Sequence, residues 1–232
     1  MGAIYLIRHG QASFGHENYD QLSARGQTQA RLLGDYLRQA GIRFDHVYSG
    51  TLERQRDTAQ LALAQAESAA HVIENPAFNE FDHLGVTRAY VKGLAEGDSL
   101  VEDFVANRID RVKYFQPVFE KVVRRWASGE FPIPGVESWK AFNERVGSGL
   151  QQVISEVGRS QNVAIFTSGG PITALMHQLL EVSSEIAFSM NWSIVNASVT
   201  KLMYSEHKTS LAYFNDHGYL QGSGDRTLVT FR

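Results

Sequence analysis

The chain has 232 residues, 43% hydrophobic and 20% charged, so it can form one large domain or two small ones with a substantial core. Its 22 basic and 25 acidic side chains give a formal net charge of -3. General nucleic-acid or membrane-surface binding is therefore disfavoured, because it needs a basic face. The absence of cysteine excludes disulfides, thiol catalysis and cysteine metal sites. No apolar run reaches the ~18 residues of a membrane span, and no segment resembles a signal peptide, so we expect a cytoplasmic protein.

The first half of the chain alternates short apolar runs with helical patterns. The first apolar run stops at Arg8-His9-Gly10, which predicts a buried strand that ends in a loop. Ser23 is suited to cap the helix that follows. In chain order we expect a strand over residues 3–7, a helix over 23–39, a strand over 46–49, a helix over 52–66 and a short strand over 72–74.

The segment from about Phe81 to Trp139 interrupts this alternation. Ser99–Glu102 is a capping-box pattern, and it predicts a helix that presents one apolar stripe as far as Phe115. Pro117 is expected to kink or end that helix, with a further helical stretch behind it. We interpret residues 81–139 as a helical insertion over one end of the sheet, because sheet strands lie on both sides of it.

The alternation resumes after the insertion. Val163–Phe166 predicts a strongly buried strand, and Pro171 suits the first turn of the helix behind it. Alternating segments predict three more strands, over Thr200–Tyr204, Leu211–Phe214 and Thr227–Phe231.

This pattern predicts an α/β fold in a single domain covering residues 1–232. We expect a three-layer sandwich whose sheet is mixed but mostly parallel. Helices would cover both faces, and the insertion would lie over the C-terminal strand ends.

Unusual side chains follow three of the predicted strands. They are Arg8-His9, Gly50–Arg54 and Thr167–Gly170. Ligands in open α/β sheets bind beyond the carboxyl ends of strands, so these segments are expected to converge. Arginine forks match the charge of a phosphoryl group, and a helix N-terminus binds anions. Each residue alone has a structural explanation, since most histidines are structural. Their convergence predicts phosphoryl transfer with His9 as nucleophile.

Five motifs along the chain point to a known family. They are Arg8-His9-Gly10, Leu22–Ala30, Leu52–Ala59, Gly135–Ser138 ahead of the helix containing Arg145, and Gly169-Gly170. With these motifs the chain resembles the histidine phosphatase superfamily, also called phosphoglycerate mutase-like. The motifs occur in the family's order along nearly the whole chain, and Gly135–Ser138 is similar to the family's Gly-Glu-Ser with one residue inserted.

The resemblance implies a phosphohistidine mechanism. His9 would attack phosphorus in line while Arg8 and Arg54 hold the phosphoryl oxygens. For attack, His9 must be neutral with one ring nitrogen free and its other N–H held by a backbone carbonyl. The stretch 78–81 is similar to the family's Leu-x-Glu, which implies Glu80 as the group that protonates the alkoxide and later activates water. Asp82 is the alternative proton donor.

The sequence departs from the family pattern around the phosphate. Ser168 stands where the family's second histidine donates to the phosphoryl group, and loss of such a donor costs about 10²–10³ in rate. The Ser168 hydroxyl and the Gly169 amide are expected to bind phosphate, and Gln11 is expected to reach it as a donor. Gly15 and Gly50 stand where members of the family commonly have Asn and Ser, so fewer polar side chains are expected around the phosphate.

Three functions are consistent with these features. The leading one is hydrolysis of a small phosphomonoester. Phosphoglycerate mutase-type transfer would need more cations for a second phosphate, and no arginine lies between Gly10 and Arg25, although the insertion contains Arg88, Lys92 and Arg108. A degenerate member that binds phosphorylated ligands without turnover is the third, suggested by Ser168. The otherwise complete catalytic set favours an enzyme.

We expect neither a metal nor a cofactor, because the arginines neutralise the phosphoryl charge and no His/Asp/Glu cluster has ligand spacing. The expected partner is a small phosphorylated substrate, with no nucleic acid and no membrane; the sequence specifies no oligomeric state. Aromatic residues of the insertion are expected to cover the pocket, although most should belong to the core. They are Phe104, Tyr114, Phe115, Trp126, Phe131 and Trp139.

Overall fold

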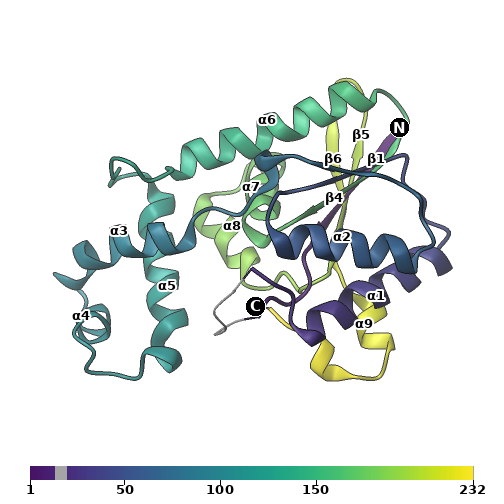
Figure 1. The fold of residues 1–232 in the computed structure, drawn as a ribbon. Coiled ribbons are helices and arrows are strands. Elements are labelled where there is room, and N and C mark those ends of the chain that lie inside the picture. The colour runs from purple at the N-terminus through teal and green to yellow at the C-terminus, as the bar shows by residue number, and fades with distance from the viewer. Residues whose placement is uncertain (14–19, 232) are drawn as a thin grey trace.

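The computed structural model describes residues 1–13 and 20–231. These residues form a six-stranded sheet of order β3-β2-β4-β1-β5-β6, in which the first four strands in this order are parallel and β5 is antiparallel to both neighbours (Figure 1). The predicted α/β class with a mixed, mostly parallel sheet is confirmed. The strands are β1 (Gly2–Arg8), β2 (His46–Ser49), β3 (Val72–Glu74), β4 (Asn162–Thr167), β5 (Val199–Tyr204) and β6 (Thr209–Asp216).

Helices cover both faces of the sheet, because successive side chains of a strand point to opposite sides. Leu6 of β1 belongs to one buried cluster with Phe142, whereas Ile7 belongs to the other with Leu33. Figure 1 shows α1 and α2 on one side of the sheet and α6 on the other. The helices are α1 (Ala24–Gln39), α2 (Glu53–Gln65), α6 (Trp139–Val157), α7 (Gly169–Leu180), α8 (Ser184–Asn191) and the short α9 (Gly218–Gly222).

Three helices form the insertion and project to one side of the sheet in Figure 1. They are α3 (His83–Ala95), α4 (Ser99–Val105) and α5 (Arg111–Ser128). Their apolar faces share a core with α6, where the ring of Trp126 lies 5.4 Å from that of Trp139.

One detail of the predicted insertion is wrong. The helix that begins at Ser99 ends at Val105 instead of reaching Phe115, and Asp110 caps a new helix through the amides of Val112 and Lys113. Asn107, with a φ of 61°, adopts the left-handed conformation that asparagine tolerates and that ends a helix. Of the two expectations for Pro117, the end of a helix is excluded, because α5 contains this proline and continues to Ser128.

The predicted last strand, Thr227–Phe231, is also wrong. Asp225 accepts from the Thr227 amide and starts a 3₁₀ turn, η2 (Arg226–Leu228). Carbonyls of this segment are bound mainly by side chains: Gln29 donates to the Leu228 carbonyl at 2.7 Å. The alternating pattern therefore reflects packing of an irregular tail and not a ladder. A second 3₁₀ turn, η1 (Pro76–Phe78), precedes the insertion. Within the described ranges, every helix is too short or too polar to cross a bilayer.

Candidate active site

Three strand ends meet at one edge of the sheet. Strands β1, β4 and β2 are parallel neighbours, with Arg8 opposite Thr167 and Ser49 opposite Phe166. A pocket of about 450 Å³ opens at this edge. The predicted site residues that line it are Arg8, His9, Arg54, Glu80 and Gly169.

His9 is held as a neutral imidazole. Its Nδ1 lies 2.7 Å from the Gly10 carbonyl oxygen, which can only accept, so Nδ1 carries the proton. The lone pair on Nε2 accepts from Arg54 Nε at 3.1 Å. Burial, followed by the charges of Arg54 and Arg8, holds the pKa of His9 well below its ordinary value, against the opposing Gly10 hydrogen bond. The arrangement favours the neutral form that the predicted role of His9 as a nucleophile requires.

The loop after His9 lies directly on the first turn of α1. A Cβ on Gly10 would lie 2.5 Å from the Gly26 carbonyl oxygen, and a Cβ on Gly26 would lie 2.1 Å from that of Gln11. Only glycine permits backbones to approach this closely. Gly10 and Gly26 therefore determine the path of the loop that positions His9.

Arg8 and Arg54 are both held by hydrogen bonds to neighbouring groups. Arg54 lies in the first turn of α2, where its Nη1 binds Asp20 Oδ1 at 2.5 Å. Arg8 donates through Nη1 to the Ile194 carbonyl and through Nη2 to the Phe231 carbonyl at 3.0 Å. Both guanidinium groups line the pocket, where their positive charge and planar shape suit a phosphoryl group.

Glu80 lies beside the N-terminus of α7. Its Oε2 accepts from the Gly170 amide at 3.1 Å, and its Oε1 accepts from the Phe81 amide at 3.1 Å. Burial raises the pKa of Glu80 above its ordinary value, although these hydrogen bonds and the arginines oppose the shift. A carboxyl that keeps its proton to higher pH suits a general acid. Asp82, the alternative donor, is exposed and caps α3 through the Gly85 amide at 2.8 Å.

The sequence matches the histidine phosphatase superfamily (branch 1) over residues 4–98 and 112–217. The chain belongs to this superfamily. Two similar relatives are 2,3-bisphosphoglycerate-dependent phosphoglycerate mutases. The one from Parvibaculum lavamentivorans is 27% identical over 197 residues, or 81% of this chain and 84% of the relative. The one from Bartonella henselae is 30% identical over 191 residues, or 78% and 83%.

Solved structures share the fold. A phosphoglycerate mutase from Bacillus anthracis has a TM-score of 0.69 at 20% identity and covers 97% of each chain. A phosphoserine phosphatase from Entamoeba histolytica has a TM-score of 0.64 at 19% identity and covers 95% of this chain and 100% of its own. A mutase and a phosphatase therefore both occur among the solved structures that share this fold.

Ser168, at the position of the superfamily's second histidine, is fully buried and is not among the residues that line the pocket. Its Oγ accepts from Gln55 Nε2 at 2.8 Å, and the same Gln55 nitrogen donates to the Phe78 carbonyl at 3.1 Å. Gln11 is also outside the lining, and its Oε1 accepts from Ser23 at 3.0 Å. A phosphate-binding role for Ser168 or Gln11 stays a prediction.

Gly50 has a packing explanation. A Cβ at this position would lie 1.9 Å from Gln55 Oε1 and 2.7 Å from Asn79 Oδ1. The two amide side chains thus occupy the space that a serine would need. Gly15, the other glycine that departs from the superfamily pattern, lies outside the described residues.

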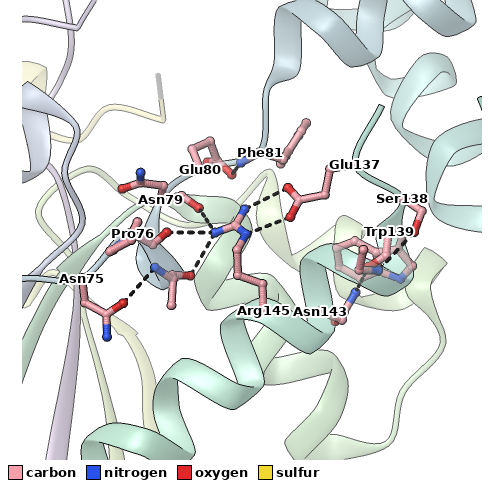
Figure 2. A network of polar contacts seen from close by, with 12 residues as sticks. Asn75, Pro76, Asn79, Glu80, Phe81, Glu137, Ser138, Trp139, Asn143 and Arg145 are labelled. Carbon is pink, nitrogen blue, oxygen red and sulfur yellow. Dashed lines mark hydrogen bonds and ion pairs between the residues drawn. The ribbon is translucent and has the colours of Figure 1, made fainter. Parts of the chain in front are cut away.

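Arg145 fixes the turn that precedes Glu80 (Figure 2). It pairs with both carboxylate oxygens of Glu137, at 2.8 and 2.9 Å. From the sequence, Glu137 was placed in a superfamily motif and Arg145 in the helix that follows it, and neither was assigned a role. Arg145 Nη1 also donates to the carbonyls of Pro76 (3.2 Å), Ala77 (3.0 Å) and Asn79 (3.1 Å).

Sequence analysis missed the rest of the pocket wall. Of the aromatic residues named in the insertion, Phe115 lines the pocket, whereas Phe104, Trp126 and Trp139 belong to the core, as expected for most of them. No group of three or more potential metal-ligating His, Cys, Asp or Glu side chains occurs in the described part of the chain. The unforeseen lining residues are Phe81, His83, Gln116, Phe119, Glu120, Asn191, Trp192 and Phe231.

Proposed function

We propose that the chain is a phosphatase that hydrolyses small phosphomonoesters through a phosphohistidine intermediate on His9. One observation carries the proposal: His9 and Glu80 line the same pocket with pKa values shifted in opposite directions. Both shifts favour the pairing that acid-assisted nucleophilic attack needs, which is a neutral base and a protonated acid.

In the first half-reaction, His9 Nε2 attacks phosphorus. The Nε2–P bond forms while the bond from phosphorus to the alcohol oxygen breaks. Glu80 transfers its proton to the departing alkoxide and becomes a carboxylate. Arg54 donates its Nε–H to the unprotonated Nε2 of His9 before the substrate enters, and to a phosphoryl oxygen afterwards.

In the second half-reaction, a water molecule attacks the phosphohistidine. The Glu80 carboxylate takes a proton from this water as its oxygen bonds to phosphorus, and the P–Nε2 bond breaks. Inorganic phosphate leaves with the former water oxygen. His9 is again neutral and Glu80 again protonated, so the cycle closes.

The distribution of cations supports hydrolysis over the mutase reaction. Arg88, Lys92 and Arg108 are exposed and absent from the described pocket lining, and Arg108 pairs with Glu102 and Asp103. Residues 14–19 contain no lysine or arginine. The charges available therefore match a single phosphoryl group.

A binding protein without turnover is the second candidate, because Ser168 supplies no cationic donor. The ordered tautomer of His9 and the raised pKa of Glu80 argue for catalysis. Neither feature is needed to bind a phosphate, for which Arg8 and Arg54 suffice.

The deciding assay compares the wild type with His9→Ala on 4-nitrophenyl phosphate. We expect at least a ~10³-fold loss of kcat. His207→Ala, at an exposed histidine, is the matched control and should keep the wild-type rate. Phosphorus NMR of 3-phosphoglycerate supplied with 2,3-bisphosphoglycerate separates released phosphate from 2-phosphoglycerate. Equal rates for His9→Ala and wild type would refute the nucleophile, and 2-phosphoglycerate as main product would favour the mutase.

A further inference from the structure

The part of the pocket beyond the strand ends is aromatic. Phe115 and Phe119 of α5 are stacked, with ring centroids 5.6 Å apart and planes inclined by 12°. Phe119 meets Trp192 edge to face, at 5.9 Å and 70°. The aromatic surface of α5 thus continues to Trp192, at the end of α8. Phe81 and Phe231 also line the pocket.

The charges in this part of the pocket are unfavourable for an anion. Among the described lining residues, the arginines are the two beside His9, and lysine is absent. Burial and the positive charge of Arg54 lower the pKa of His83, which favours its neutral form. Glu120 contributes a carboxylate, and Gln116 Nε2 donates to its Oε1 at 3.0 Å.

We infer that the substrate is the phosphomonoester of an aromatic or similarly flat apolar alcohol that carries no second anionic group. This inference rests on the proposed phosphatase activity and specifies its leaving group. Aromatic walls gain free energy by burying an aromatic ring and by offset or edge-to-face contacts with it. The pocket volume of about 450 Å³ falls in the range of small-molecule sites.

A second anionic group would be disfavoured for two reasons. A carboxylate entering the aromatic wall would lose hydration without gaining a cation. It would also face the like charge of Glu120, which lines the same pocket. The amide of Gln116 donates to one Glu120 oxygen and so offsets part of that charge, but it does not neutralise the carboxylate.

Two matched pairs of alkyl esters test the inference, because all four release a primary alcohol. Phenethyl phosphate is compared with ethyl phosphate, and the methyl ester of 3-phosphoglycerate with 3-phosphoglycerate itself. We expect kcat/KM to favour phenethyl phosphate about 10²-fold and the methyl ester about tenfold.

Variants assign each preference to its side chain. Phe119→Leu should lower the phenethyl-to-ethyl ratio about tenfold. Glu120→Gln should bring the ester-to-acid ratio close to one. Phe131→Leu removes an aromatic residue of the insertion that lies outside the lining and should change neither ratio. Because each ratio is measured within one protein, a reduced folded fraction cancels.

Failure of the inference and failure of the proposed function give different results. Hydrolysis that depends on His9 but prefers ethyl phosphate or 3-phosphoglycerate overturns the substrate class alone. Absence of hydrolysis of all four esters overturns the phosphatase. In that case the esters are titrated as ligands by calorimetry, where tighter binding of phenethyl phosphate supports the aromatic class and equal binding overturns it.

Discussion

Arg54 donates its Nε–H to Nε2 of His9 at 3.1 Å, so the proposed attacking atom is hydrogen-bonded to the side chain that is also proposed to bind the phosphoryl oxygens. With the Gly10 carbonyl on Nδ1, this contact fixes the tautomer from both sides of the ring. Asp20 holds the other end of the guanidinium. In the proposed mechanism, the phosphoryl oxygens replace His9 as acceptors for Arg54.

Arg54→Gln should lower kcat/KM about 10²–10³-fold, because a charged donor to the phosphoryl oxygens is lost. The pKa of His9 should rise toward its ordinary value, since the charge of Arg54 helps to lower it. NMR titration of the His9 ring measures this shift. Arg56→Gln is the control, because Arg56 also lies in α2 but pairs with Glu74. It should change neither kcat/KM nor the pKa of His9. An unshifted His9 in Arg54→Gln would contradict the electrostatic account.

Glu80→Gln should separate the two half-reactions. With 4-nitrophenyl phosphate the leaving group needs little protonation, so the first turnover should stay within about tenfold of wild type. Breakdown of the phosphoenzyme should slow about 10²–10⁴-fold, because no base activates water. Stopped-flow absorbance would then show a burst of one nitrophenolate per active site. Asp82→Asn should retain steady turnover; a burst in that variant instead would make Asp82 the proton donor.

The two shifted pKa values define a pH window. Protonation of His9 removes the nucleophile only below its lowered pKa, and ionisation of Glu80 removes the acid only above its raised pKa. The kcat/KM for an alkyl phosphate should therefore fall on the acidic side through His9 and on the alkaline side through Glu80. The alkaline limb should weaken for 4-nitrophenyl phosphate, and equal limbs for both substrates would argue against Glu80 as the acid.

The same shift makes a prediction about stability. Because folding raises the pKa of Glu80, the folded state binds more protons than the unfolded state between the two values, and stability is lost as pH rises through that window. A glutamine at position 80 does not ionise, so it is not subject to this loss of stability. Glu80→Gln should therefore unfold at a higher Tm than wild type at pH 8, and the gain should shrink toward pH 4. A lower Tm at pH 8 would show that the ionised carboxylate is stabilised in the fold.

Arg145→Met should act on catalysis through the position of Glu80. Arg145 binds the carbonyl of Asn79, the residue before Glu80, so loss of the clamp misplaces the acid. We expect kcat on an alkyl phosphate to fall about tenfold or more, and to fall less on 4-nitrophenyl phosphate, which depends less on Glu80. Arg145→Lys should restore part of the alkyl activity. Equal losses on both substrates would indicate a purely structural role.

The fold and the convergence of the candidate site residues on one pocket were largely predictable because their signals are local. The cap at Ser23 accepts from the Gly26 amide as its position before the helix predicts, and the strand over His46–Ser49 has the predicted bounds. Strand ends that carry His9 and Arg54 converge because parallel neighbours end at the same edge.

The pocket wall and the clamp on Glu80 depend on contacts between distant parts of the chain. Arg145 reaches a carbonyl 66 residues earlier, and no spacing rule encodes that pairing. Phe119 meets Trp192 only because α5 folds back against α8. The segment 227–231 alternates like a strand, yet Gln29 and a cap at Asp225 bind it as an irregular tail.

Detection of the covalent intermediate tests the proposed phosphohistidine mechanism most directly. Glu80→Gln is mixed with ³²P-labelled 4-nitrophenyl phosphate, quenched in base, where phosphohistidine survives, and the label is located by peptide mass spectrometry. We expect up to one phosphoryl group per chain, on His9, and none in the His9→Ala protein. Label on another residue, or wild-type turnover with no phosphoenzyme detectable in either protein, would contradict it.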